Sequence, residues 1–365
     1  MKARAIIIGI NQYPSATGQR MLHGAVNDAV DFASWAVDPD GGQVPIENCY
    51  FWGFPAPAAL PPVLARLGDA DRPWPLDPPQ EFAQTPSAQA ITLALEAAAD
   101  LSRAASLESD GGERLYVFLA GHGAMTTPKS LSEDSQNCLV ASDYAPNTAF
   151  GLVPLDDLRR MLERRGPREV LLISDCCRTA LPQTVPSPIL NVSEYNDLGY
   201  NDQWLTGRAA RAGAIAYETP LDEPTRGAFT KTLVQALRQY RIDGQLTLTD
   251  LRGFVRHGVK KLVTPKSQVP GFLLKVEDSE DEPFVVVNGQ PIGELPKVSI
   301  LFPAGLDGEI RLIDSRDNVH GDPLTIADRK VEVPLAPGQY SAEHVATGHH
   351  TEFFHFGPET TDVQF

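Results

Sequence analysis

The sequence predicts an α/β fold, in which a mostly parallel sheet is flanked by helices, followed by a small all-β sandwich domain. Over about the first 250 residues, continuous apolar runs alternate with segments of helical spacing, as in parallel sheets that are covered on both faces. Towards the end of the chain, short strand-like runs recur between turn residues, which is typical of a β-sandwich. With 365 residues, 42% of them hydrophobic, the chain is long enough for one large and one small domain.

The first part of the chain opens with a buried strand, the β-branched run AIIIGI at residues 5–10. Apolar residues at helical spacing predict helices at residues 24–37 and 88–105, and a short strand is expected at 48–53. Residues 54–85 are rich in Pro and Ala and show little periodicity. We therefore expect an irregular surface insertion there.

The next part of the chain continues the alternation. Three more buried strands are predicted, at residues 114–120, 169–174 and 212–217, with a short one at 137–144. The helices expected between and after them lie at residues 154–165, 227–240 and 248–263. Because parallel strands point the same way, their carboxyl ends meet at one edge of the sheet, where functional groups gather.

The composition changes at residues 288–297 (NGQPIGELPK), which we interpret as a linker. It separates a domain of residues 1–287 from a C-terminal β-sandwich domain of residues 298–365. The strands expected in the second domain lie at residues 298–302, 309–313, 330–335, 340–345 and 351–356.

Charge and cysteine content narrow the function classes. The net charge is −16 and no run of three basic residues occurs, so nucleic acid is not an expected partner, whereas basic peptides are. The four cysteines form neither a disulfide framework nor a CxxC zinc site, which favours a reducing, cytoplasmic setting. No apolar stretch is long enough to span a membrane, and the amino terminus lacks a signal-peptide pattern, so no membrane association is expected.

Two chemically active residue types follow predicted strands. His122 lies in a Gly-His-Gly turn after strand 114–120, and the adjacent Cys176 and Cys177 follow strand 169–174. A thiol beside a histidine base is the arrangement that a cysteine protease needs. A common edge of a parallel sheet would bring them together, although the residues alone leave open which cysteine is the nucleophile.

Five segments in this order resemble the caspase-like cysteine peptidases, above all the bacterial caspase homologues and the metacaspases. They are AIIIGINQYP at 5–14, GAVNDA at 24–29, LYVFLAGHG at 115–123, VLLISDCCRTA at 170–180 and AYETPLDEPTRGAFTKTLVQAL at 216–237. The resemblance covers roughly residues 1–285. It implies the caspase–haemoglobinase-like fold and an endopeptidase activity on protein or peptide substrates.

The resemblance also implies the roles of individual residues. The family nucleophile lies two residues after an Asp, which selects Cys177, after Asp175, and makes Cys176 a packing residue. His122 would be the base of a Cys–His dyad. The backbone N–H groups of Gly123 and Cys177 would form the oxyanion hole.

The specificity implied by the resemblance is for a basic residue. Caspases bind Asp in a basic pocket, whereas metacaspases bind Arg or Lys in an acidic one. Asp28 and Asp175 match the acidic positions of the latter, and two carboxylates suit a guanidinium group. Ala120 replaces a Ser that is common in metacaspases, which leaves the choice between Arg and Lys open.

Several further expectations concern regulation. Arg208 and Arg211 are predicted to lie in a loop before the strand at 212–217, where they are candidate self-cleavage sites for an Arg-specific enzyme. No cofactor or metal is expected. Calcium, which some metacaspases need, has only the acidic stretches Glu133-Asp134 and 277–282 to bind, and neither is an EF-hand loop. His349, His350 and His355 lack zinc-ligand spacing.

Bacterial caspase homologues act in signalling, in defence, including antiviral defence, and in cell death, and an upstream protease or regulatory protein is a further expected partner. The main alternative is a catalytically silent caspase fold that serves as an interaction module in a signalling complex. The intact His122 and Cys177 argue against it. A different α/β hydrolase or a nucleotide-binding protein would need a GxSxG, Walker or GxGxxG motif, and the sequence has none.

Overall fold

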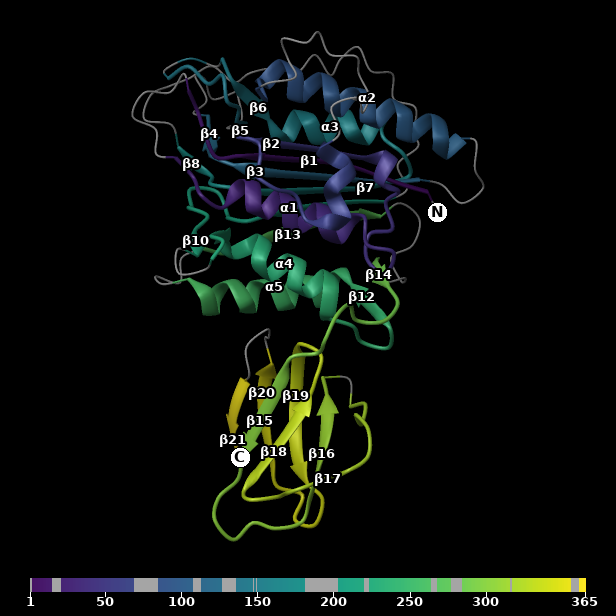
Figure 1. Ribbon diagram of the computed structural model, residues 1–365, viewed down its shortest axis with the longest axis vertical. Helices are drawn as coiled ribbons and strands as arrows, with labels where there is room; N and C mark the ends of the chain where they lie inside the picture. The colour runs from purple at the N-terminus through teal and green to yellow at the C-terminus, as the bar shows by residue number, and fades with distance from the viewer. Residues whose placement is uncertain are drawn as a thin grey trace. The chain divides into compact units, whose positions relative to one another are not determined.

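The computed structural model (Figure 1) describes residues 2–14, 21–68, 85–107, 113–126, 136–146, 148, 150–180, 203–219, 223–263, 268–276, 284–315, 317–355 and 361–365. The chain divides into two compact units. The first comprises Met1–Val234 and Val255–Glu282, and the second comprises Gln235–Phe254 and Pro283–Phe365.

The first unit is built on a six-stranded sheet in the order β13-β9-β7-β3-β1-β2. Strands β1, β2, β3, β7 and β9 run parallel, and only β13 is antiparallel to its neighbour β9. The mostly parallel sheet predicted from the sequence is therefore confirmed. The bounds are Lys2–Ile10 (β1), Cys49–Phe54 (β2), Glu113–Gly121 (β3), Glu169–Cys176 (β7), Gln203–Arg208 (β9) and Gly271–Val276 (β13).

Helices cover both faces of this sheet, with α2 and α3 on one face and α1 on the other (Figure 1). Alternate residues of β1 and β3 serve the two faces: Ile6 and Ile8 belong to the cluster that α2 and α3 cover, whereas Phe118 stacks on Phe32 of α1. The helices are Ala25–Ala36 (α1), Ala88–Leu107 (α2), Leu155–Arg165 (α3), Ala228–Gln239 (α4) and Leu248–Leu262 (α5).

Gly9 sets the position of α1 against the sheet. A Cβ at this residue would overlap the carbonyl oxygen of Ala25 and lie 2.8 Å from the Cβ of Ala29. Glycine thus allows the first turns of α1 to approach the backbone of β1 closely. The same turns carry Asp28, so this contact places that side chain relative to the carboxyl edge of the sheet.

A second, four-stranded sheet, in the order β6-β5-β4-β8, continues from the carboxyl edge of the first. Its strands are Gly123–Met125 (β4), Asn137–Val140 (β5), Leu152–Pro154 (β6) and Thr179–Ala180 (β8). The other short elements are the 3₁₀ helices Ile46–Asn48 (η1) and Pro62–Gly68 (η2), the pair Glu218–Thr219 (β10) and Arg226–Gly227 (β11), and the pair Gln245–Thr247 (β12) and Val285–Asn288 (β14).

The C-terminal strands form two sheets, β18-β15-β21 and β17-β16-β19-β20, which share one hydrophobic core. Ile300 and Val331 come from the first sheet and Ile310 and Ala342 from the second, as expected for a β-sandwich. The strands are Lys297–Leu301 (β15), Glu309–Asp314 (β16), Leu324–Thr325 (β17), Lys330–Pro334 (β18), Gly338–His344 (β19), His350–His355 (β20) and Thr361–Gln364 (β21).

One predicted strand is wrong. Residues 212–217 form an irregular segment, and the next parallel strand after β7 is β9, Gln203–Arg208. The apolar look of residues 212–217 comes mainly from Ala and Gly, and Ile215 is exposed, so the segment has no buried apolar face. In the predicted insertion at 54–85, residues 62–68 form η2, while residues 69–84 lie outside the described part of the chain.

Within the described part of the chain, no helix combines the length and the apolar character that crossing a membrane requires.

Candidate active site

His122 and Cys177 lie at equivalent points of two neighbouring strands. His122 is the one residue between β3 and β4, and Cys177 follows β7 two residues before β8. The pairing of β3 with β7 ends at Gly121 and Cys176, and the pairing of β4 with β8 resumes at Ala124 and Thr179. The structure therefore brings His122 and Cys177 together at the carboxyl edge of the sheet.

The backbone after His122 lies directly against the cysteine pair. A Cβ at Gly123 would overlap the carbonyl oxygen of Cys177 and lie 2.7 Å from the Cβ of Cys176. No side chain fits at this position unless the backbone moves. The second glycine of the Gly-His-Gly turn is thus required by the close packing of the two strand ends.

The two adjacent cysteines differ in environment. The Cys176 side chain is buried in the hydrophobic core, with its Sγ 3.7 Å from the carbonyl oxygen of Leu119. Cys177 is half-buried, and its Sγ lies 3.4 Å from the backbone nitrogen and 3.5 Å from the carbonyl oxygen of Ala216. Of the two thiols, Cys177 is the one that a substrate can reach.

The surroundings of the Cys177 thiol favour its neutral form. Burial raises its pKa most, the Ala216 N–H lowers it, and the carboxylates of Asp175 and Glu218 raise it further. A thiol with a raised pKa is a poor nucleophile at neutral pH unless a base removes its proton. Cys177 therefore needs a base, such as His122, to remove its proton.

The segment at 209–217, predicted in part as a strand, instead lies along the residues that follow β7. The backbone N–H of Arg178 donates to Ala214 O at 2.9 Å, and the Gly213 N–H donates to Arg178 O at 2.8 Å. The buried Gln268 side chain donates to Ala209 O at 3.1 Å and accepts from the Tyr217 N–H at 2.9 Å. These contacts hold Ala216 beside the Cys177 thiol.

Two carboxylates converge next to this segment. Asp28 of α1 and Asp175 of β7 are only 3% and 7% exposed. A Cβ at Gly227 would overlap an Asp175 carboxylate oxygen and lie 2.8 Å from an Asp28 carboxylate oxygen. The Gly227 N–H donates to both Asp28 oxygens, and Thr230 donates its O–H to Asp175 at 2.6 Å.

The neighbouring charged groups that affect the pKa values of Asp28 and Asp175 are themselves carboxylates. Burial raises the pKa of Asp28 well above its usual range, and the Asp175 carboxylate raises it further. Burial raises the pKa of Asp175 to about 6, against the lowering effect of its hydrogen bonds from Thr230, and Glu218 adds to the rise. A cationic side chain would relieve this accumulation of negative charge.

Glu218 is a third acid that sequence reasoning missed. Its Oε1 accepts from the His23 N–H at 2.8 Å and from the Gly24 N–H, next to the helix that carries Asp28. Its charge also raises the pKa values of Asp28, Asp175 and Cys177. Glu218 lies in the segment AYETPLDEPTRGAF, which belongs to one of the segments that carry the family resemblance. Nothing in the local sequence indicates that the Glu218 side chain points towards α1.

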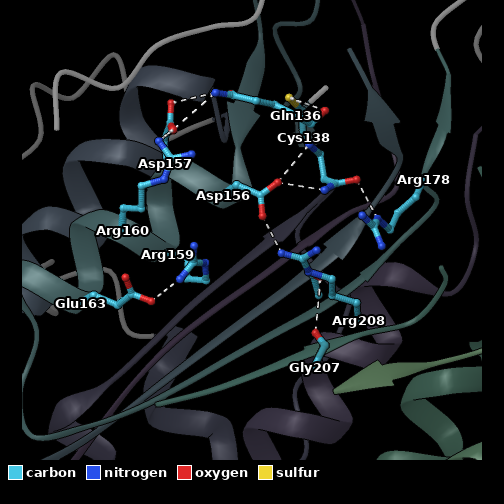
Figure 2. A network of polar contacts seen from close by, with 12 residues as sticks. Gln136, Cys138, Asp156, Asp157, Arg159, Arg160, Glu163, Arg178, Gly207 and Arg208 are labelled. Carbon is cyan, nitrogen blue, oxygen red and sulfur yellow. Dashed lines mark hydrogen bonds and ion pairs between the residues drawn. The ribbon is translucent and has the colours of Figure 1, made fainter. Parts of the chain in front are cut away.

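The predicted loop position of Arg208 is wrong. Arg208 ends β9, and its guanidinium contacts Asp156 Oδ1 at 2.6 Å (Figure 2). The other Asp156 oxygen accepts from Asn137 at 2.9 Å, and Asn137 accepts from Arg178 Nε at 2.7 Å. Arg208 is therefore part of a polar network that reaches the residue after Cys177, whereas Arg211 is exposed in the segment that follows β9.

The acidic stretches considered for calcium, Glu133-Asp134 and 277–282, lie outside the described residues. Within the residues that are described, no group of three or more His, Cys, Asp or Glu side chains has an arrangement suited to a metal ion.

The family model for the caspase domain matches residues 2–278. Among solved structures, a protein of Geobacter sulfurreducens is similar over 80% of this chain and 100% of its own, with 14% identity and a TM-score of 0.46. Caspase-1 from Spodoptera frugiperda is similar over 80% of this chain and 92% of its own, with 11% identity and a TM-score of 0.45.

A search of curated proteins finds no significant match. Since the caspase-domain match spans most of the chain and includes the strands that carry His122 and Cys177, the chain belongs to the caspase-domain family of cysteine peptidases, which act on protein substrates.

Proposed function

We propose that this chain is an endopeptidase that cleaves peptide bonds after Arg or Lys, using Cys177 and His122. The observation that carries the proposal is the convergence of the Asp28 and Asp175 carboxylates on Gly227, close to the half-buried thiol of Cys177. A cationic side chain bound there would place the carbonyl group of its residue near that thiol.

The proposed chemistry follows from the raised pKa of the Cys177 thiol. His122 accepts the Cys177 proton as the sulfur attacks the carbonyl carbon of the substrate, and the electron pair of the C=O double bond moves to the oxygen, which becomes an oxyanion. The backbone N–H groups of Gly123 and Cys177 would stabilise that charge. His122 then returns the proton to the leaving amine, and water hydrolyses the thioester with His122 again as the base.

The specificity follows from the electrostatics of the pocket. Asp28 and Asp175 are buried and held by hydrogen bonds from Gly227 and Thr230, so they are pre-organised for a cation rather than free to turn towards water. Glu218 adds a third negative charge nearby. An acidic side chain in the same place would meet like charges, which disfavours substrates with Asp at the cut position.

The most direct test is cleavage of fluorogenic peptides that differ only in having Arg, Lys or Asp at the cut position. We expect turnover of the Arg and Lys peptides by the wild type, none by Cys177→Ala, and retained turnover by Cys176→Ala. Turnover of the Asp peptide alone would refute the pocket assignment. Absence of any turnover, with or without calcium, would favour the non-catalytic interaction module.

Self-processing is part of the proposal, with Arg211 as its site, because Arg211 is exposed and Arg208 is bound to Asp156 within the structure. Intact-mass analysis of the purified chain tests it. The wild type should yield a cut after Arg211 that is missing from Cys177→Ala, and Arg211→Gln should remain uncut. A fragment ending at Arg208 would contradict this assignment.

The cellular setting is proposed on the resemblance to bacterial caspase homologues. We propose a cytoplasmic enzyme of a signalling, defence or cell-death pathway that an upstream protease or regulatory protein activates. Gel-filtration and activity assays with a candidate activator would test it, because an enzyme that is fully active alone would need no such partner.

A further inference from the structure

The hydroxyl of Tyr13 joins the ends of β1 and β3 beside His122. The ladder between these strands ends at Gly9 and Ala120. Beyond it, the Tyr13 hydroxyl donates to Ile10 O at 3.0 Å and accepts from the His122 N–H at 2.6 Å. A phenol has one proton to donate and lone pairs to accept with, so both contacts form at once.

The Tyr13 ring also contacts the imidazole. The centroids of the two rings are 4.8 Å apart, with planes inclined by 38°. The side chain is 7% exposed, and burial raises the pKa of its hydroxyl well above the usual value, so the proton given to Ile10 is retained. A Cβ at Gly121 would lie 2.9 Å from the hydroxyl oxygen, so a glycine there leaves room for this contact.

We propose that Tyr13 is a positioning residue for His122: its hydroxyl holds the backbone of His122, and its ring holds the imidazole in the orientation that accepts the Cys177 proton. The proposal rests on the role of His122 as the base. His122 is the single residue between two strands of different sheets, and its carbonyl oxygen is held by the Val140 N–H at 2.9 Å. The Tyr13 hydroxyl accepts from the other polar backbone group of His122, its N–H. Both backbone groups are therefore fixed, and the backbone at the turn can move little.

The ring contact has a chemical consequence as well. His122 becomes a cation when it takes the thiol proton, and the face of a neighbouring phenol ring stabilises a cation. Tyr13 thus favours the protonated imidazole after transfer as well as its orientation before it. Neither effect involves the pocket for the substrate side chain, so binding of substrate should not depend on Tyr13.

The test is Tyr13→Phe, which keeps the ring and removes the hydroxyl, with Tyr116→Phe as the matched control. Tyr116 is a buried tyrosine on β3 whose hydroxyl contacts Arg114 at 3.4 Å, away from the carboxyl edge. We expect kcat to fall about tenfold or more in Tyr13→Phe with KM unchanged, as for a misplaced catalytic group. Tyr116→Phe should keep the wild-type kcat, and thermal melting shows whether both variants are folded.

A second readout needs no substrate. The rate at which iodoacetamide alkylates Cys177 is measured against pH by mass spectrometry in the wild type, Tyr13→Phe and His122→Ala. The Tyr13→Phe profile should shift towards that of His122→Ala. A wild-type profile and a wild-type kcat in Tyr13→Phe would overturn the proposal. If His122→Ala itself left the alkylation profile unchanged, the role of His122 as base would be refuted, and with it the premise of the proposal.

Discussion

At the scale of single residues, Gly227 is the position where the proposed specificity is most easily altered. It lies at the point where Asp28 and Asp175 meet, and an added methyl group would overlap an Asp175 carboxylate oxygen and lie 2.8 Å from an Asp28 carboxylate oxygen. Its backbone also holds Asp28 through the Gly227 N–H. The residue is therefore both a spacer and a hydrogen-bond donor.

Gly227→Ala should abolish the preference for basic residues. We expect kcat/KM for an Arg peptide to fall about 100-fold, equivalent to roughly 2.7 kcal/mol, since the Ala methyl overlaps Asp175. Steady-state kinetics measures this. Gly253→Ala is the control: a Cβ there meets no neighbouring atom and lies on α5, so activity should be unchanged and stability unchanged or higher. Unaltered kinetics in Gly227→Ala would show that the substrate side chain binds elsewhere.

The raised pKa of Asp175 predicts a pH dependence of substrate binding. Below a pH of about 6 Asp175 takes up a proton. The pKa of Asp28 is raised as well, by burial and by the Asp175 carboxylate, so its titration acts in the same direction. The pocket then loses negative charge, so KM for an Arg peptide should rise as the pH falls through about 6. KM measured from about pH 8 to pH 5 checks this. In Asp175→Asn the KM should be high and should change less with pH than in the wild type, and a wild-type profile in that variant would contradict the assignment.

At the scale of elements, the end of β9 is linked to the turn after β7 through α3. Asp156, at the start of α3, is the shared acceptor for Arg208 and Asn137, and Asn137 accepts from Arg178 (Figure 2). Burial opposes the charge on Asp156, but Arg208 and the hydrogen bonds keep its pKa below the usual value. The network thus connects Arg208, at the end of β9, with Arg178, the residue that follows Cys177.

Asp156→Asn should loosen this network. Two partly buried guanidinium groups would lose their shared counter-charge, and we expect the free energy of unfolding to fall by about 2 kcal/mol. Urea denaturation followed by fluorescence measures the loss. The matched control is Asp100→Asn, whose carboxylate pairs with Arg165 on the surface and is half exposed, so the change there should stay within about 0.5 kcal/mol. Equal losses in the two variants would argue against a special role for the network.

The same elements show where sequence reasoning succeeded and where it failed. Strands β1, β3 and β7 are long apolar runs buried on both faces, so their composition predicts them. Strand β9, QWLTGR, is half polar. Thr206 and Gly207 are nevertheless buried, because β9 lies between two other strands of the sheet. Pairing with β7 on one side and β13 on the other makes that segment a strand, whereas local pattern assigned the strand to residues 212–217.

At the scale of the whole molecule, the buried carboxylate of Asp175 lowers stability at neutral pH. The folded-state pKa of Asp175 lies above the unfolded value, so the folded state binds a proton more tightly than the unfolded one. Its contribution to stability is complete below the unfolded pKa and is lost as the pH rises through about 6. At neutral pH the unliganded enzyme thus carries an unfavourable buried charge.

Asp175→Asn should therefore stabilise the protein at neutral pH while it impairs binding. Thr230 can still donate to the amide oxygen, and the desolvated charge is gone, so we expect a gain of about 2 kcal/mol near pH 7.5 that shrinks towards pH 5. Thermal melting of the wild type and the variant at the two pH values measures it. A variant that is less stable than the wild type near pH 7.5 would mean that the charge on Asp175 is already compensated within the fold.

The amino-acid sequence by itself determined the alternation of strands and helices, the C-terminal sandwich, and the positions of His122 and Cys177 after strand ends, because hydrophobic period and chain order are local properties. The resemblance already named Asp28 and Asp175, but only the tertiary structure decided how these and the other residues around the pair are placed. The convergence of Asp28, Asp175 and Glu218, the hold of Tyr13 on His122 and the capture of Arg208 by Asp156 each join residues distant in the chain. Such contacts depend on the directions of side chains across packed elements, which no local pattern records.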